Sequence, residues 1–270
     1  MNSASGSSAL ARSVRRRVAR MACAAKASHI GSCYSVADIL AVLYAEVMNF
    51  RPQEPKWPGR DRFILSKGHA AAAVYATLAE IGCLPVEALD SYGADGSLLM
   101  THISHKIDGV EFSTGSLGHG LPFGVGKALA GKISQAVWKT FVLLSDGEMG
   151  EGSNWEALMF GAHHGLDKLT AIIDYNKLQS LTTIEKTLRL EPLAAKLTAF
   201  GWAVREVDGH DHGAVAELLR STPWQPGRPS ALVAHTVKGK GVSFMENKVE
   251  WHYRSPDAAQ LALALSELEG

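Results

Sequence analysis

Two apolar stretches with polar ends, Phe141-Val-Leu-Leu-Ser-Asp-Gly147 and Thr170-Ala-Ile-Ile-Asp-Tyr-Asn176, decide the fold. Each begins with a continuous apolar run of strand length, and such runs are typical of parallel strands that are buried on both faces of a sheet. Asp146 ends the first run and Asn176 follows the second about thirty residues later, which is the length of one strand–helix–strand crossover. We therefore expect both side chains to emerge at the same edge of a parallel sheet.

Strand-length runs and helical patterns alternate along the rest of the chain. Further strands are expected at residues 63–66, 203–207 and 231–237. Helices are expected at residues 14–27, 36–47, 69–81, 154–164, 193–200 and 214–219, with predicted capping boxes at Ser35/Asp38 and Ser153/Glu156. The alternation predicts a doubly wound α/β fold, with a mainly parallel sheet and helices on both faces. No repeat or linker divides the chain, so we expect a polar arm at residues 1–8 and one domain at residues 9–270.

Composition argues against several classes of function. The 27 basic residues equal the 27 acidic ones, so no net charge favours nucleic acid or an acidic membrane. No apolar run approaches the roughly 20 residues of a membrane helix, and the N-terminus lacks the apolar core of a signal peptide. Cys23, Cys33 and Cys83 lack metal-ligand spacing and suit a reducing cytosol. We expect a soluble cytoplasmic protein with no nucleic-acid or membrane partner, in which Arg15–Arg17 form a solvated helix face.

The two strand ends suggest a metal site. A carboxylate from Asp146 and an amide oxygen from Asn176 would form a hard oxygen site suited to Mg²⁺ or Ca²⁺. Gly147 lets the backbone approach an anion closely, and such a metal usually keeps positions open for phosphate oxygens. Asp-Gly and Asn-Lys are also common turn dipeptides, so each alone would be explained as an ordinary turn.

Together at this spacing, the pair resembles the magnesium–diphosphate signature of thiamine-diphosphate enzymes, although Ser145 stands where that signature usually has a glycine. Further segments resemble the transketolase family over roughly Ala9 to Pro256. They are Lys26-Ala-Ser-His29-Ile-Gly31, Asp61-Arg-Phe-Ile-Leu-Ser-Lys-Gly-His69, His102 ahead of Gly109-Val-Glu111, Ser113-Thr-Gly115-Ser-Leu117-Gly118, Thr236-Val-Lys-Gly-Lys-Gly241 and Trp251-His252.

The resemblance implies roles for particular residues. It implies a metal held by Asp146, Asn176 and the backbone carbonyl of Leu178, and catalytic histidines at His29 and His102 that face the sugar. It also implies cofactor contacts from His69, Gly115, Leu117, Gly147, Glu151 and His252, with Glu151 meeting its counterpart across a dimer interface. The position of His69 agrees with this, because a predicted helix begins there and the N–H groups at a helix start favour a diphosphate.

The resemblance also implies the function and the partner. The chain is similar to the N-terminal subunit of a split transketolase, which uses thiamine diphosphate to transfer a two-carbon ketol unit between sugars or sugar phosphates. The pyrimidine-binding and C-terminal domains would belong to a second chain in an α₂β₂ assembly. A glutamate of that partner would activate the cofactor, so we expect this chain to be active only with its partner.

Three alternatives remain open from the sequence. The α subunit of a 2-oxoacid dehydrogenase or decarboxylase carries the same metal signature, but the histidine segments favour transketolase. A non-catalytic cofactor-binding subunit is a second alternative, which the intact metal and diphosphate ligands make less favourable. Gly118-His-Gly120-Leu-Pro-Phe-Gly124 resembles a dinucleotide loop, but its spacing is one residue too long and no clear strand precedes it.

Overall fold

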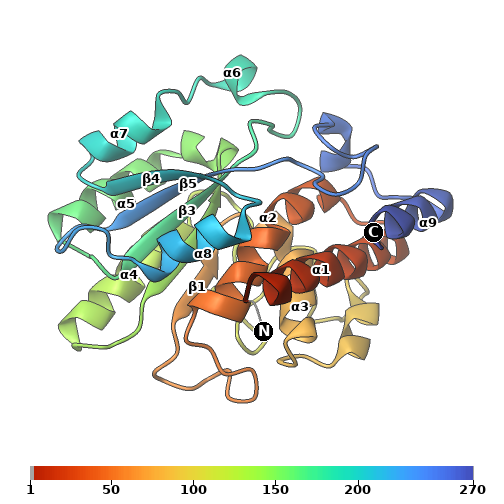
Figure 1. Ribbon diagram of the computed structural model, residues 1–270, viewed down its shortest axis with the longest axis horizontal. Coiled ribbons are helices and arrows are strands. Elements are labelled where there is room, and N and C mark those ends of the chain that lie inside the picture. Colours follow the sequence, from red (N-terminus) through yellow and green to blue (C-terminus); the bar gives the residue numbers. More distant parts are fainter. Residues whose placement is uncertain (1–2, 270) are drawn as a thin grey trace.

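The computed structural model, which describes residues 3–269, contains one parallel sheet with helices on both faces (Figure 1). The strand order is β1-β2-β3-β5-β4. The strands are β1 (Arg62–Leu65), β2 (Thr140–Ser145), β3 (Leu169–Tyr175), β4 (Ala203–Asp208) and β5 (Ser230–His235). All residues of β1, β2 and β3 are buried, which explains their continuous apolar runs, whereas β4 lies at the sheet edge and is partly exposed. The predicted doubly wound α/β fold is confirmed.

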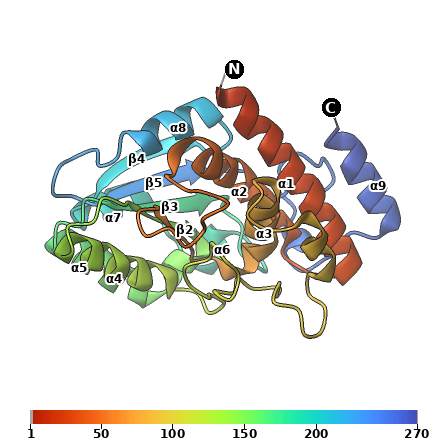
Figure 2. The same ribbon diagram turned by 90° about the horizontal axis from the view of Figure 1, so that it is seen from below.

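The helices form a layer on each side of the sheet, as Figure 2 shows for α2 and α8 on one side and α4 and α5 on the other. Alternate strand residues face the two layers; Leu143 and Ile172 belong to the core with α1, α2, α3 and α8, while Val142 and Ile173 belong to the core with α4, α5 and α7. The helices are α1 (Ser3–Ala25), α2 (Ile30–Val42), α3 (Ala71–Glu80), α4 (Gly120–Ile133), α5 (Gly152–His163), α6 (Ile184–Thr187), α7 (Leu193–Ala199), α8 (His212–Arg220) and α9 (Ala258–Glu267).

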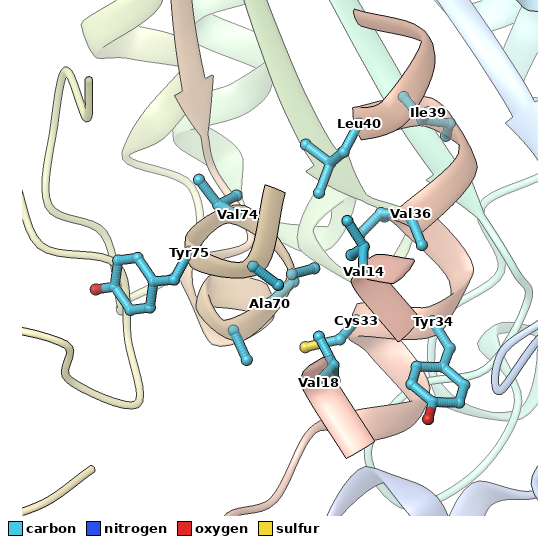
Figure 3. Packing of buried hydrophobic residues seen from close by; sticks show 14 of the residues in the cluster. Val14, Val18, Cys33, Tyr34, Val36, Ile39, Leu40, Ala70, Val74 and Tyr75 are labelled. Carbon is cyan, nitrogen blue, oxygen red and sulfur yellow. The ribbon is translucent and has the colours of Figure 1, made fainter. Parts of the chain in front are cut away.

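Apolar side chains of α1, α2 and α3 interlock in the larger core (Figure 3). Val14, Val18, Val36, Leu40 and Val74 are each at most 1% exposed. Burying such a side chain contributes about 1.5–3 kcal/mol to stability relative to leaving it in water. The 18-residue window at 30–47 has a mean hydropathy of 1.4, enough by composition for a membrane span, but 83% of it is buried inside the molecule. Its apolar side chains therefore serve the core.

The N-terminal part differs from the sequence prediction. Helix α1 begins at Ser3, so residues 3–8 of the expected polar arm are helical; residues 1 and 2 lie outside the described part of the chain. Ser7 is fully buried, and its hydroxyl donates to Glu46 at 2.5 Å. Arg15, expected on a solvated face, is 5% exposed and pairs with Asp38. These polar residues satisfy one another inside the fold, which a count of apolar residues cannot predict.

Both predicted capping boxes were wrong. Helix α2 begins at Ile30, so Ser35 lies inside it and donates its hydroxyl proton to Asp174 at 2.7 Å. Helix α5 begins at Gly152, and the Ser153 hydroxyl donates to the Gly118 carbonyl at 2.7 Å instead of capping the helix. In each case the hydroxyl has a tertiary partner and caps no helix, although Ser35 Oγ also lies 3.1 Å from the Ser32 carbonyl within α2. Helix α4 was not predicted, and the segment after residue 237 contains a 3₁₀ turn (Val249–His252) and the capped helix α9.

Candidate functional site

The carboxyl ends of β2 and β3 bring Asp146 and Asn176 to one cavity, as the sequence predicted. The backbone N–H of Asp146 donates to the carbonyl of Asp174 at 3.2 Å. The Asp146 carboxylate accepts from the backbone N–H groups of Gly147 at 2.7 Å and Lys177 at 2.5 Å. These bonds join the loops after the two strands and fix the position of the carboxylate.

The predicted metal donors lie at this edge: the Asp146 carboxylate, the Asn176 side-chain oxygen and the Leu178 carbonyl. Burial, and then the charge of Asp174, raise the pKa of Asp146 to about 7, whereas a nearby cation would favour its ionised form. The described residues contain no cluster of three or more His, Cys, Asp or Glu side chains that could hold a metal. A cation here would therefore depend on one carboxylate together with amide and carbonyl oxygens. Mg²⁺ and Ca²⁺ accept such donors, so the residues fit such an ion.

Asp174 supports this edge from below. Its fully buried carboxylate accepts from Lys67 Nζ at 2.5 Å, from Ser35 Oγ at 2.7 Å, from Asn176 Nδ2 at 3.1 Å and from the Thr236 hydroxyl. Burial alone would raise the pKa of Asp174, but the charge and hydrogen bond of Lys67 and the hydroxyl bonds hold it below its usual value. Because the Asn176 amide nitrogen donates to Asp174, its Oδ1 faces the loop after β3, where it accepts from the Leu178 N–H at 3.1 Å and keeps a second lone pair for a metal.

One cavity of about 280 Å³ unites the predicted site residues. Every one of them except Glu151 lines it: His29, His69, His102, Gly115, Leu117, Asp146, Gly147, Asn176, Leu178 and His252. A larger cavity of about 560 Å³ lies beside the loop after β3, but none of the four predicted histidines (His29, His69, His102 and His252) lines it. The smaller cavity is therefore the candidate site.

Four histidines from distant segments meet in this cavity. The ring centroid of His29 lies 5.1 Å from that of His69, 5.7 Å from that of His102 and 5.0 Å from that of His252. Burial lowers the pKa of all four, to about 4 for His29 and about 3 for His252. All four are therefore neutral near pH 7, and a neutral imidazole can donate from one nitrogen and accept at the other. Such a group can orient a hydroxyl or carbonyl of a sugar.

His29 is held in an unusual backbone conformation. Its φ is 73°, in the left-handed region that is uncommon for residues other than glycine. Its N–H donates to the His252 carbonyl at 2.7 Å, and its own carbonyl accepts from Ser32 at the start of α2 at 3.0 Å. Surrounding bonds thus fix a conformation that costs about 1–3 kcal/mol, which is typical of functional sites.

Two buried lysines in the cavity, Lys67 and Lys238, were not predicted from the sequence. Lys238 is 1% exposed, and its Nζ lies 2.9 Å from His252 Nδ1 and 3.3 Å from the carbonyl oxygens of Leu178 and Gln179. Burial, and then the charge of Lys67, lower the pKa of Lys238 to about 8. The signal was present, because each lysine stands next to a glycine just after a strand. The other unpredicted lining residues are Ser32, Ser145, Gln179, Ser180 and Tyr253.

The loop that carries Gly115 and Leu117 is fixed against the strand ends. The Thr114 hydroxyl donates to the Leu65 carbonyl at 2.6 Å, and a Cβ added to Gly68 would lie 2.3 Å from the Thr114 carbonyl oxygen. Gly68 therefore permits the close approach of two backbone segments. The next residue, His69, lies in a 3₁₀ turn that leads into α3, so it stands at a helix start as expected.

Glu151 is the predicted site residue that the structure leaves outside the cavity. It is exposed at the N-cap position of α5, where its side chain makes no capping bond. Its side chain packs against Gly118, because a Cβ added there would lie 2.7 Å from Glu151 Cβ. Its contact with the cofactor and its role across a dimer interface both stay predictions.

Comparison with known proteins identifies a family for the whole chain. Residues 7–267 match the family described as "Transketolase, thiamine diphosphate binding domain". The chain is 43% identical over 254 residues to an apulose-4-phosphate transketolase subunit of Phocaeicola vulgatus, a match that covers 94% of this chain and 90% of the relative. It is 39% identical to the 6-deoxy-6-sulfo-D-fructose transketolase subunit SqwG of a Clostridium species, over 89% of this chain and 88% of the relative.

Solved structures show the same fold. The transketolase from Leishmania mexicana superimposes with a TM-score of 0.91 at 29% sequence identity. The match covers 97% of this chain but 41% of that protein. The chain thus corresponds to nearly the full length of the two relatives that are named as transketolase subunits, and to less than half of the Leishmania protein.

Proposed function

The chain belongs to the transketolase family, as its N-terminal, thiamine-diphosphate-binding part, and we propose that it is catalytically active only together with a C-terminal transketolase subunit. The observation that carries the proposed transketolase activity is a single cavity. In it, the oxygen donors suited to a metal ion meet two lysines and four histidines. The relatives from Phocaeicola vulgatus and Clostridium are named as transketolase subunits, which supports a two-chain enzyme. We further propose an α₂β₂ assembly, in the cytoplasm, with Glu151 at the interface between copies.

The residues at the strand ends would hold the metal and the diphosphate. We propose that Asp146, Asn176 and the Leu178 carbonyl bind Mg²⁺, or Ca²⁺ in its place. Lys238 supplies positive charge beside them, and its buried ammonium is already in contact with the Leu178 carbonyl. His69 adds the N–H groups of a helix start, which favour an anion.

His29 and His102 would contact the sugar, whereas His252 would contact the cofactor. When bound, thiamine diphosphate supplies the nucleophilic carbon that carries the two-carbon unit. His29 and His102 are neutral and can donate a proton to, or accept one from, a hydroxyl of the ketose or aldose. Because Lys238 donates to Nδ1 of His252, the neutral His252 ring carries its proton on Nε2 and keeps one donor.

The substrate class is a sugar or a sugar phosphate. The relatives are named for apulose 4-phosphate and for 6-deoxy-6-sulfo-D-fructose, so closely similar chains serve sugars with different anionic groups. We propose that this chain contributes the groups that meet the ketol end, which is common to these sugars. Selection of the anionic end would fall to the partner.

Reconstitution tests the proposed reaction. The purified chain is mixed with a C-terminal transketolase subunit, Mg²⁺ and thiamine diphosphate, and supplied with ketose donors and aldose acceptors in free and phosphorylated forms. We expect ketol transfer, seen as a shortened donor and an acceptor longer by two carbons. Release of CO₂ from 2-oxoacids without ketol transfer would instead favour the 2-oxoacid dehydrogenase alternative, and cofactor binding without either reaction would favour a non-catalytic subunit.

A further inference from the structure

A buried polar network shares no residue with the proposed metal, cofactor or sugar sites. Its centre is Asp38 of α2, whose carboxylate is contacted by Arg15 of α1 at 2.5 Å, by His210 at 2.6 Å and by His212 at 3.0 Å. The side chains of these residues are between 6% and 13% exposed. Burial alone would raise the pKa of Asp38, but these partners hold it well below its usual value. The network is therefore a charged carboxylate that three side chains contact, while Nε of Arg15 is buried without a hydrogen-bond partner.

The two histidines of the network differ in what they do with their second nitrogen. Nε2 of His210 lies 2.8 Å from the backbone nitrogen of Val237. A backbone N–H can only donate, so Nε2 of His210 accepts and the ring proton sits on Nδ1, which faces Asp38. In His212, by contrast, Nδ1 faces the Ser7 hydroxyl at 2.8 Å, on the side of α1. Only His210 reaches toward the cavity.

Val237 leads directly to the cavity lysine. The next residue, Lys238, is 1% exposed, and its Nζ contacts the Leu178 carbonyl and His252. Its stem packs against Gly31, where an added Cβ would lie 3.2 Å from Lys238 Cγ. The backbone on either side of Lys238 is held as well, because Gly239 N–H donates to the Gly31 carbonyl at 3.0 Å. The His210 bond therefore fixes the one backbone N–H immediately before this lysine.

The loop that carries His210 is itself tightly seated. Asp208 accepts from the His210 N–H at 2.9 Å, and Gly209 N–H donates to the carbonyl of His235 at 2.8 Å. A Cβ added to Gly209 would lie 2.5 Å from Thr236 Cγ2, so the loop after β4 lies directly against the end of β5. This contact leaves His210 little freedom to move away from Val237.

We propose that His210 is a positioning residue for Lys238, acting from Asp38 through the backbone N–H of Val237. This inference rests on the proposed function, in which Lys238 contacts the cofactor diphosphate. Neutral His210 donates to the Asp38 carboxylate and accepts from the Val237 N–H. It therefore connects the buried charge of Asp38 to the backbone that carries Lys238. Within residues 3–269 no bond of His212 leads to the cavity; its ring joins Asp38 of α2 to Ser7 of α1.

The paired variants His210→Phe and His212→Phe separate positioning from packing. Each removes one histidine contact to Asp38, so we expect similar losses of melting temperature in the two chains. In the complex with Mg²⁺ and a C-terminal transketolase subunit, we expect His210→Phe to raise the Kd for thiamine diphosphate about tenfold. This is the effect of losing roughly one hydrogen bond. His212→Phe stays within about twofold of the unaltered chain. Equal weakening in both variants, or none in His210→Phe, would overturn the inference.

Amide hydrogen exchange of the cofactor-free chain provides a second readout. We expect the Val237 amide to exchange severalfold faster in His210→Phe and at the unaltered rate in His212→Phe. His210→Gln, which keeps one donor and one acceptor, restores slow exchange and serves as the variant of choice if His210→Phe does not fold. Unchanged Val237 exchange in His210→Phe, or fast exchange in His210→Gln, contradicts the positioning role. Failure of the unaltered complex to bind thiamine diphosphate would instead contradict the proposed function.

Discussion

Lys67 and Asp174 form an ion pair with Nζ 2.5 Å from Oδ2, and both side chains are at most 1% exposed. The pair lies directly under the edge where the loops after β2 and β3 meet, and Asp174 also holds the amide of Asn176. A buried pair of this kind contributes little net stability, but removing one partner leaves an uncompensated charge in the interior. The pair therefore fixes the geometry of the metal edge.

Lys67→Met should destabilise the chain by about 3–5 kcal/mol, because the Asp174 carboxylate would stay buried without its cation. Urea unfolding at pH 7 measures this loss. Lys56→Met is a matched control, since its ion pair with Asp108 is 79% and 50% exposed and should contribute about 0–1 kcal/mol. Equal unfolding midpoints for both variants would show that the buried pair is not needed.

Folding stability should fall as the pH drops from about 6.5 toward 4. In this window the unfolded chain protonates its histidines, whereas the folded chain keeps His29 neutral down to a pKa of about 4 and His252 down to about 3. The unfolded state then binds more protons, so stability rises with pH. Asp146 works in the opposite direction, because its pKa is raised to about 7 in the folded, metal-free chain.

The contribution of one histidine can be isolated by difference. His252→Asn should show a smaller loss of unfolding free energy between pH 6.5 and 4 than the unaltered chain. Urea unfolding at several pH values measures both. If the two chains lose stability equally over this window, the buried neutral state of His252 is not supported.

Asp146→Ala should abolish Mg²⁺-dependent binding of thiamine diphosphate, because it removes the one charged donor of the proposed metal site. The fold should remain, since Asp146 lies at a strand end and outside the apolar cores. Calorimetry with the C-terminal subunit present measures the affinity, and circular dichroism checks the fold. At pH 6 the unaltered complex should also release close to one proton per Mg²⁺ bound. Unchanged cofactor affinity in Asp146→Ala would exclude this residue as a ligand.

His29→Ala and His102→Ala should each lower kcat/KM by about 10²-fold or more, the range for a lost acid–base or electrostatic contribution. The Kd for thiamine diphosphate should hardly change, because we assign these two rings to the sugar. Steady-state kinetics of the complex and calorimetry measure the two quantities separately. A parallel loss of cofactor affinity and activity in either variant would place that histidine at the cofactor instead.

The sequence predicted the sheet and the pairing of Asp146 with Asn176 because both depend on local signals. Continuous apolar runs identify β2 and β3, and the polar residues at their ends, Asp146 and Asn176, must meet when the strands are neighbours. The positions of His29, His69, His102 and His252 came from the family resemblance, and the structure brings all four rings together.

What the sequence could not predict depends on contacts between distant polar residues. Ser35 has the spacing of a helix cap, but its partner is Asp174, 139 residues away. Lys67 and Lys238 each stand beside a glycine just after a strand, which marks a strand-end loop, but only the packed strand ends show that both side chains are buried. Glu151 belongs to the same motif as Asp146, but the start of α5 turns it away from the cavity. Such pairings have no signature in local composition.

We propose that this chain contributes half of the catalytic site. Asp146 is the only carboxylate among the residues that line the described cavity, and we assign it to the metal. The family resemblance places the glutamate that activates the cofactor on the partner chain. The direct test is exchange of the C2 proton of thiamine diphosphate for deuterium, followed by NMR in the presence of Mg²⁺. We predict that the chain alone leaves the rate equal to that of free cofactor, and that a C-terminal transketolase subunit raises it by orders of magnitude. Rapid exchange with the chain alone would contradict the half-site account.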